Sequence, residues 1–360
     1  MNRKTSLREW GARLAVIGTA LVWAPAAFAA TQPGVDARGN ATIPSFTVPF
    51  SAYASPEAHR MFQRILDQGR HAPPLNGPIA ASRAYYGKLN GDRAKLMERL
   101  YPVTIRAQTI AGVPVQVVTP KQGIAAKQKN RVLINLHGGA FLWGAKFGGL
   151  VEAIPVAGVG GFKVVTVDYR QGPEHVFPAG SEDVAAVYQA LLKQYPAKNI
   201  GIYGCSAGGV LTAEAVAWFI EKHIPTPGAV GTFCGSVAEL DGDSAYIAPV
   251  LDGEPPPSSP MKLSDLPYFK GASARDPLVF PANSPKLLAK FPPTLLITGT
   301  RDFTMSSEIQ SQRLLQDAGV DAELHVWDGM WHSFFSDPEM PESKEAYAVM
   351  VDFFDRHLGR

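Results

Sequence analysis

The sequence has few of the residues on which metal-built, disulfide-built or nucleic-acid-binding proteins depend. It contains two cysteines in 360 residues, too few for a disulfide framework, and no cysteine–histidine cluster has the spacing of a zinc site. Charged residues make up 18% of the chain and nearly cancel, with 34 Lys and Arg against 32 Asp and Glu. Without an excess of positive charge there is no electrostatic footprint for nucleic acid. We therefore expect neither a metal nor a nucleic-acid partner.

Long apolar runs are also missing, except near the start of the chain. Basic residues between positions 3 and 13 precede an apolar run from Leu14 to Phe28, and Ala27-Phe28-Ala29 forms a small-x-small cleavage site. This pattern predicts a secretory signal peptide over residues 1–29 and an exported, periplasmic or secreted protein. An uncleaved anchor is the alternative, although the run is shorter than the ~20 apolar residues that a membrane span needs. Cleavage would remove four basic residues and one acidic residue, would change the formal charge from +2 to −1, and would leave no membrane partner.

The remaining chain, in a sequence that is 46% hydrophobic, has the makeup of a globular protein that can bury a sizeable core. Residues 30–54 are polar and rich in Pro and Gly, which is typical of a linker or a surface arm. Ser55-Pro56 predicts the start of an amphipathic helix that ends at Gly69. A second helix is expected over residues 79–100, interrupted near Asn90-Gly91.

From Tyr101 onward, short β-branched runs alternate with helical patterns. This alternation predicts an α/β fold whose mostly parallel sheet has helices on both faces. The first two runs, joined by Ala111-Gly112, are expected to pair as an antiparallel hairpin at the sheet edge. The eight expected strands are 103–110, 113–119, 132–136, 164–167, 200–203, 229–233, 294–297 and 322–326. The helices expected between and after the later strands are 183–192, 208–220, 307–318 and 343–357.

Residues 241–290 interrupt the alternation. They are rich in Pro, Ser and Asp, and Pro255-Pro256-Pro257 is incompatible with a regular element. A stretch of this length inside a compact fold favours a functional insertion over a plain loop.

Gly204-Cys205-Ser206-Ala207-Gly208 matches the G-x-S-x-G pattern and falls between an expected strand and an expected helix. A turn at this place holds the serine in a strained conformation that exposes its oxygen, and the helix start adds N–H groups and the positive end of its dipole. The same five residues could form no more than a glycine-rich turn. Their position between a strand and a helix favours Ser206 as a nucleophile.

A nucleophilic serine needs a base and an acid that orients the base. His332 follows the last expected strand and so lies at the same sheet edge as Ser206, whereas other histidines fall in helices, in a strand interior or before the sheet. Asp302 follows the strand that begins at Thr294, at the edge where open α/β sheets place their sites. Asp328 is the rival acid, but it shares a loop with His332 and is expected to shape that loop. The order Ser206, Asp302, His332 is that of α/β-hydrolases.

Acyl transfer also requires donors for an oxyanion. His137-Gly138-Gly139-Ala140-Phe141 directly follows a strand, the position of an HGGG-type loop. We predict that the N–H groups of Gly138, Gly139 and Ala207 form the oxyanion hole. His137 is expected to be structural.

Together these motifs resemble the hormone-sensitive-lipase-like branch of α/β-hydrolase esterases, and the resemblance covers residues 101–358. It implies a carboxylic-ester hydrolase whose cap is built from N-terminal helices, roughly residues 44–100, and from the 241–290 insertion. It also implies that Glu174 and His175 hold the segment 168–179 beside the oxyanion loop. The expected organisation is therefore a signal peptide (1–29), a linker with N-terminal cap helices (30–100) and an α/β-hydrolase catalytic domain (101–360). The motifs that carry the resemblance are the loop at His137, Asp168-Tyr169-Arg170, Pro173 to Ala179, the Ser206 turn, and Pro292-Pro293-Thr294 leading to Asp302.

Two residues depart from the family pattern. Cys205 stands where the family usually has Asp or Thr, and Ala140 stands where many members have a third glycine. Cys205 is interpreted as a small buried residue, and the alternative is a disulfide with Cys234. Ala140 puts the tolerance of bulky alcohol groups in doubt.

We predict a serine carboxylesterase that acts on short- to medium-chain esters through an acyl-enzyme and needs no cofactor. A lactonase or an amidase with the same three side chains is the main alternative, and a non-catalytic small-molecule binder belongs to a different class. A true lipase is disfavoured because the cap segments lack a long apolar surface. Near the site, Trp143, Trp331 and Phe334 either line a substrate pocket or pack in the core. The oligomeric state stays open, a homodimer included.

Overall fold

An eight-stranded sheet carries the predicted motifs in the computed structural model, which describes residues 33–359. The expected signal peptide lies outside the described residues and stays a prediction. The chain divides into two units between Pro49 and Phe50. The described part of the first unit contains a short antiparallel pair, β1 (Gly34–Val35) and β2 (Ala41–Thr42), whose residues are all exposed.

The sheet belongs to the second unit, and its strand order is β10-β9-β8-β7-β5-β6-β4-β3. The strands from β10 to β6 are parallel, whereas β4 is antiparallel to both of its neighbours. The central strands are buried throughout, which is why their sequences are continuous apolar runs. The strands are β3 (Val103–Ile110), β4 (Val113–Pro120), β5 (Val132–Leu136), β6 (Val164–Val167), β7 (Ile200–Cys205), β8 (Ala229–Phe233), β9 (Thr294–Arg301) and β10 (Ala322–Trp331).

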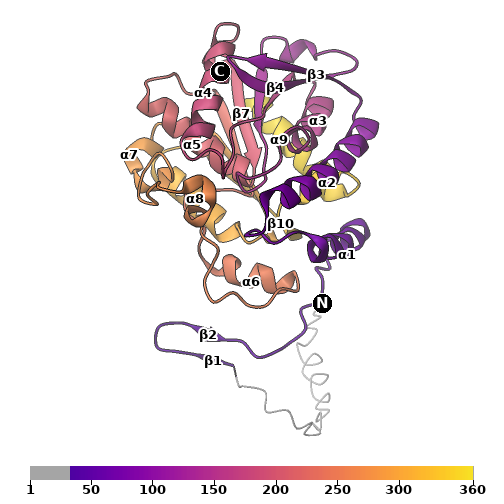
Figure 1. Cartoon of the computed structure of the whole chain (residues 1–360), viewed down its shortest axis with the longest axis vertical. Coiled ribbons are helices and arrows are strands. Elements are labelled where there is room, and N and C mark those ends of the chain that lie inside the picture. Colours follow the sequence, from indigo (N-terminus) through magenta and orange to yellow (C-terminus); the bar gives the residue numbers. More distant parts are fainter. Residues whose placement is uncertain (1–32, 360) are drawn as a thin grey trace, which may run out of the picture. The chain divides into compact units, whose positions relative to one another are not determined.

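Helices cover both faces of the sheet (Figure 1), and each face has its own apolar core. One core involves α4, α5 and α8, and the other involves α1, α2, α3 and α9. No helix within residues 33–359 is long and apolar enough to cross a membrane. The helices are α1 (Pro56–His71), α2 (Ile79–Leu100), α3 (Gly148–Gly160), α4 (Ala179–Leu192), α5 (Ala207–Glu221), α6 (Asp243–Leu251), α7 (Pro285–Leu288), α8 (Met305–Asp317) and α9 (Pro341–His357). Short 3₁₀ turns are η1 (Ala126–Gln128), η2 (Ala197–Asn199), η3 (Leu263–Asp265), η4 (Pro267–Phe269), η5 (Pro281–Asn283) and η6 (Phe334–Ser336).

The predicted α/β architecture is confirmed, including the eight strands and the hairpin formed by β3 and β4. Strands β9 and β10 continue further than expected, to Arg301 and Trp331, so that each ends next to a predicted site residue. Pairing between the two strands continues past the expected ends, with Trp327 opposite Gly299 and Trp331 opposite Arg301, and it extends both strands beyond what local propensity indicates.

One predicted helix interruption and one predicted helix end are wrong. Helix α2 is continuous through Asn90-Gly91, and Gly91 is buried against the ring of Phe147. Helix α1 passes Gly69 and ends at His71, where the Ala72 N–H donates to the Gly69 carbonyl. At Gly91, packing against Phe147 outweighs the helix propensity that glycine lowers, whereas Gly69 is exposed in the last turn of α1 and nothing packs against it.

Helix α3 was not expected from the sequence. Its glycines and Pro155 lower its helix propensity, and because it is buried on nearly every side it has no amphipathic pattern. The insertion is also more regular than expected, because α6 and α7 form on either side of the triple proline. Proline disrupts a helix only where it occurs, and the flanking residues are free to form one.

Two glycines in helices should respond in opposite directions to alanine. At Gly91 an added Cβ would lie 3.6 Å from the Phe147 ring, an ordinary contact, so Gly91→Ala should raise the free energy of unfolding by about 0.5–1 kcal/mol. At Gly158 the Cβ would lie 2.8 Å from the Tyr101 Cβ, so Gly158→Ala should lower it by about 1–3 kcal/mol. Denaturant midpoints at constant m-value measure both. Shifts of the same sign would contradict this description of α2 and α3.

Candidate active site

Ser206 occupies the turn between strand β7 and helix α5. Its backbone φ is 58°, in the left-handed region that residues other than glycine rarely adopt. The Ser206 N–H donates to the carbonyl of Phe233 at 2.7 Å, which ties the turn to the end of β8. The turn therefore has the strained geometry that the motif predicts, and Ser206 borders the main cavity.

The two motif glycines are required by a close approach to strand β5. A Cβ at Gly204 would lie 2.2 Å from the Leu136 carbonyl oxygen, and one at Gly208 would lie 1.8 Å from the same atom. Both distances are far below a van der Waals contact. Any side chain at either position would push the turn away from β5 and displace Ser206.

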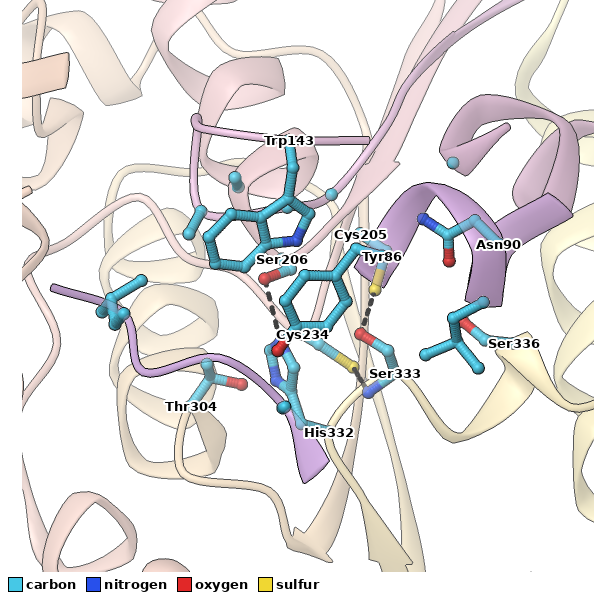
Figure 2. A pocket seen from close by; sticks show the side chains of 18 of the residues that line it. Tyr86, Asn90, Trp143, Cys205, Ser206, Cys234, Thr304, His332, Ser333 and Ser336 are labelled. Atoms are coloured by element: carbon cyan, nitrogen blue, oxygen red, sulfur yellow. Dashed lines mark hydrogen bonds between the residues drawn. The ribbon is translucent and has the colours of Figure 1, made fainter. Parts of the chain in front are cut away.

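His332 and Asp302 reach Ser206 from the ends of two other strands. His332 follows β10, and its Nε2 lies 2.9 Å from the Ser206 Oγ (Figure 2). Its Nδ1 lies 2.8 Å from Oδ1 of Asp302, which follows β9. With a proton on Nδ1, the imidazole donates to Asp302 and accepts from the serine hydroxyl. The structure thus brings the three predicted side chains into one hydrogen-bonded chain.

Asp302 is completely buried, yet its surroundings favour the ionised form. Burial opposes ionisation, but the positive charge and hydrogen bond of His332 and the N–H of Thr304 at 2.9 Å outweigh it, so the pKa of Asp302 lies below its ordinary value. The Thr298 hydroxyl donates a further hydrogen bond at 3.0 Å. A carboxylate held in this way can orient the imidazole and stabilise its protonated form.

Asp328, the rival acid, lies within strand β10 and not in the expected loop, and it fixes the end of that strand. It accepts hydrogen bonds from the Ser51 hydroxyl and from the Thr300 hydroxyl, the latter at 3.1 Å. The Thr300 oxygen in turn accepts from the Gly329 N–H at 2.8 Å. These contacts fix the irregular end of β10 immediately before His332.

The loop after β5 supplies donors, but one of the predicted donors is wrong. The Gly138 N–H donates to Oε1 of Glu152 at 3.1 Å and so is already bound. Within residues 33–359 the N–H groups of Gly139, Ala140 and Ala207 have no recorded protein acceptor, and all three residues border the cavity. Positive φ at Gly139 (120°) and Ala140 (52°) turns this part of the loop. The pair of loop donors therefore lies one residue later than predicted.

His137 has the structural position that was expected. It is fully buried, its Nδ1 lies 2.7 Å from the Gly138 carbonyl, and its ring stacks on Tyr169 at a centroid distance of 4.4 Å. The Tyr169 hydroxyl also donates to the His137 carbonyl at 2.7 Å. Burial lowers the pKa of His137, so the ring is neutral and packs as part of the loop's foundation.

Glu174 and His175, which the resemblance places beside the loop, have different roles. Both oxygens of Glu174 accept from Arg83 at 2.7 Å, and Arg83 also donates to the carbonyls of Leu142 and Gly172 at 2.9 Å. The Arg83 hydrogen bond lowers the pKa of Glu174 to about 2. Glu174 thus fixes Arg83, which ties helix α2 to the loop. The His175 side chain is exposed and makes no hydrogen bond within the described chain, and its attraction to Glu174 is a small further cause of the lowered pKa of Glu174, so its holding role stays a prediction.

Cys205 and Cys234 lie under the site as free thiols. The Cys205 sulfur contacts the Ser333 hydroxyl at 2.8 Å, and the Cys234 sulfur accepts from the Ser333 N–H at 3.3 Å (Figure 2). The Cys205 thiol thereby contacts the residue that follows His332. Burial raises the pKa of both thiols, which keeps them protonated and unreactive.

One group of side chains within residues 33–359 could supply metal ligands. Ligand atoms of Cys234, Asp302 and His332 lie within 4.8 Å of one another. Two of these three residues already bind each other in the chain that leads to Ser206, so a metal ion there would compete with that hydrogen bond. The geometry therefore favours the hydrogen-bonded arrangement over a metal centre.

A cavity of about 630 Å³ opens at Ser206. Of the predicted pocket residues, Trp143 and Trp331 border it, whereas Phe334 is fully buried and packs in the core. Trp143 stacks on Tyr86 of helix α2 with ring centroids 4.5 Å apart (Figure 2). Both expected cap segments reach the cavity, with Ile65, Leu75 and Tyr86 from the first and Met261, Leu263 and Leu266 from the second.

Several residues at the site carry no signal in the sequence. Tyr86 and Glu152 lie on helices, and only packing brings them to the loop and the nucleophile turn. Phe303 stacks on the His332 ring with centroids 4.4 Å apart. Its position directly after Asp302 was the one hint that it would lie nearby.

Comparisons with known proteins agree with this geometry. A model of the alpha/beta hydrolase fold family matches residues 133–336. The crystal structure of an esterase, E25, has a TM-score of 0.74 at 29% identity, covering 88% of this chain and 98% of that one. The crystal structure of an esterase from the bacterial hormone-sensitive lipase family has a TM-score of 0.74 at 28% identity, covering 85% of this chain and 99% of that one. An acetyl-hydrolase of Streptomyces hygroscopicus is 26% identical over 65% of this chain and 78% of its own.

The two thiols should be free but inaccessible. The folded protein, prepared without reductant, should react slowly with a thiol reagent, and the unfolded protein should react at both Cys205 and Cys234. Mass spectrometry after alkylation counts the modified residues. If neither cysteine is alkylated after unfolding, the pair is a disulfide and this description of the site is wrong.

Proposed function

The chain belongs to the α/β-hydrolase fold family, in its hormone-sensitive-lipase-like branch, and from this premise we propose that it is a serine carboxylesterase acting on short- to medium-chain esters. The observation that carries the proposal is the hydrogen-bonded chain from Ser206 through His332 to Asp302, with distances of 2.9 and 2.8 Å. The Ser206 end of this row of hydrogen bonds borders the cavity. Backbone N–H groups that have no protein acceptor among the described residues border the same cavity.

The reaction proceeds in two acyl transfers. His332 Nε2 takes the proton of the Ser206 hydroxyl as Oγ bonds to the ester carbonyl carbon, and the carbonyl electron pair moves to oxygen. The bond to the alcohol oxygen then breaks, and that oxygen receives the proton from His332. A water molecule repeats the sequence on the acyl-enzyme, which releases the acid and regenerates Ser206.

The developing oxyanion would be bound by the N–H groups of Gly139, Ala140 and Ala207. Ala207 begins helix α5, so its donor also lies at the positive end of the helix dipole. A single preorganised donor of this kind is worth about 3–4 kcal/mol of transition-state stabilisation in other hydrolases. Asp302 stays ionised and stabilises the imidazolium that forms in each transfer.

The shape of the cavity supports small acyl groups. The stacked rings of Tyr86 and Trp143 line the same cavity as Ser206 (Figure 2), and the stack holds each ring against the other. A volume of about 630 Å³ is in the range of pockets for small ligands. An acyl chain of many carbons would have to pass these rings.

Loss of the nucleophile should abolish hydrolysis. Ser206→Ala should reduce kcat for p-nitrophenyl acetate by about a million-fold, and Asp302→Asn by about ten-thousand-fold, because the imidazole loses its partner. Asp328→Asn, in strand β10, should cost less than about tenfold. Initial rates with circular dichroism as a folding control measure this. A wild-type protein without hydrolysis would favour a non-catalytic binder, and faster turnover of a lactone or an anilide would favour a lactonase or an amidase.

Chain-length preference should depend on Trp143. The wild type should hydrolyse p-nitrophenyl esters from acetate to butyrate faster than p-nitrophenyl palmitate. Trp143→Ala should raise the ratio of kcat/KM for the octanoate ester to kcat/KM for the acetate ester by about tenfold, because it enlarges the cavity that Ser206 borders. Trp218→Ala, which removes a tryptophan that contacts Lys222 outside the cavity, is the matched control. An unchanged ratio in Trp143→Ala would show that these rings do not limit the acyl group.

A further inference from the structure

Glu152 is a buried carboxyl group for which the proposed reaction has no use. It lies on helix α3, in which it is the sole charged residue of the segment from Gly148 to Gly160. The residue is 9% exposed, and it borders the same cavity as Ser206. Ionisable side chains are seldom retained in such a place unless their charge or hydrogen bonds are needed.

The carboxyl group binds three donors from three parts of the site. Its Oε1 accepts from the Gly138 N–H at 3.1 Å, in the loop that carries the oxyanion donors. Its Oε2 accepts from the Cys205 N–H at 3.2 Å, directly before the nucleophile, and from the Asn135 side-chain amide at 2.8 Å, on strand β5. One side chain therefore joins the donor loop to the nucleophile turn.

We propose that Glu152, in its ionised form, is a positioning residue that holds the oxyanion loop at the correct distance from Ser206. This inference rests on the proposed esterase function. The oxyanion donors begin at Gly139, one residue after the bound Gly138, so a shift of Gly138 shifts the donors themselves. Displacements of about 1 Å in such constellations can cost about a hundredfold in rate.

The donor set matches a carboxylate and not a carboxylic acid. All three contacts bring an N–H to Glu152, and an ionised carboxyl group accepts at both oxygens without offering a proton of its own. Protonation would place an O–H on one of these oxygens and weaken at least one of the contacts. The loop and the turn are then less firmly joined.

Burial sets the pH at which this happens. It raises the pKa of Glu152 to about 8, while the hydrogen bonds from Asn135, Gly138 and Cys205 lower it in part. The titratable groups that interact electrostatically with Glu152 are Tyr169 after β6, Tyr203 on β7 and Cys205, each with its own pKa raised by burial, and no cation contributes. His137, next to Gly138, is neutral.

The sign of the effect is opposite for activity and for stability. Because the folded-state pKa is above the ordinary value, the folded protein binds the proton more tightly, and stability from this group is lost as pH rises from about 4.5 toward about 8. Activity should rise over the upper part of that window as the carboxylate forms. The active form of the loop is thus the less stable ionisation state of Glu152.

The first test compares two buried glutamates. Glu152→Gln keeps the size of the side chain but replaces one acceptor by a donor, and kcat should fall by about tenfold to a hundredfold while KM changes less than about twofold. The alkaline rise in the wild-type pH–kcat profile should disappear in this variant. Glu214→Gln, on helix α5, is the matched control, because Glu214 is likewise buried but forms no hydrogen bond to the loop or the turn, and its profile should match the wild type.

A second measurement, by NMR, keeps Glu152 in place, so it depends neither on the folding of Glu152→Gln nor on ester hydrolysis. In the Ser206→Ala protein, ¹³C labelling of the glutamate carboxyl groups measures the pKa of Glu152. The ¹⁵N–¹H resonance of Gly138 should shift with the same pKa. Absence of a coupled shift at Gly138 would overturn the proposal, as would wild-type kcat and an unchanged pH profile in Glu152→Gln. If the esterase proposal is wrong, the wild type will be inactive but the Gly138 titration will persist. If the Glu152 proposal is wrong, the wild type will hydrolyse esters but the Gly138 titration will be absent.

Discussion

The close packing of the nucleophile turn against strand β5 is the constraint on which the site depends. Gly204 and Gly208 approach the Leu136 carbonyl so closely that no side chain fits at either position. The same strand ends at Leu136, and the donor loop starts with the next residue. The backbone at the end of β5 therefore both supports the nucleophile turn and leads into the loop that carries the oxyanion donors. A change in the turn is transmitted directly to those donors.

Burial gives the charged groups of the site their different properties. Asp302 is buried next to hydrogen-bond donors and to a histidine whose protonated form attracts it, so its pKa is lowered and it stays ionised. Glu152 is buried next to neutral donors alone, so its pKa is raised. In a medium of low dielectric, the presence or absence of one cation decides which state a carboxyl group adopts. The two acids beside the nucleophile turn therefore have pKa values shifted in opposite directions, downward for Asp302 and upward for Glu152.

Sequence patterns predicted the parts of this protein that depend on local chemistry. The buried parallel strands could be recognised because they are β-branched runs, and the turn at Ser206 because it combines small residues with a strand and a helix. Helix α3 escaped prediction because a helix buried on all sides has no amphipathic period. Phe334 could not be separated from the pocket aromatics, since its burial depends on Trp327 and Phe335, which pack against it.

The sequence by itself determined the fold class and predicted the three side chains, Ser206, Asp302 and His332, that the structure brings together, because parallel strands bring their carboxyl ends to one edge. Only the tertiary structure decided that Glu152 occupies the Gly138 N–H, that Arg83 joins Glu174 to the loop, and that Tyr86 stands beside Trp143. Each of these contacts joins residues from elements whose relative placement follows from the packing of whole helices on the sheet, and no local pattern encodes that placement.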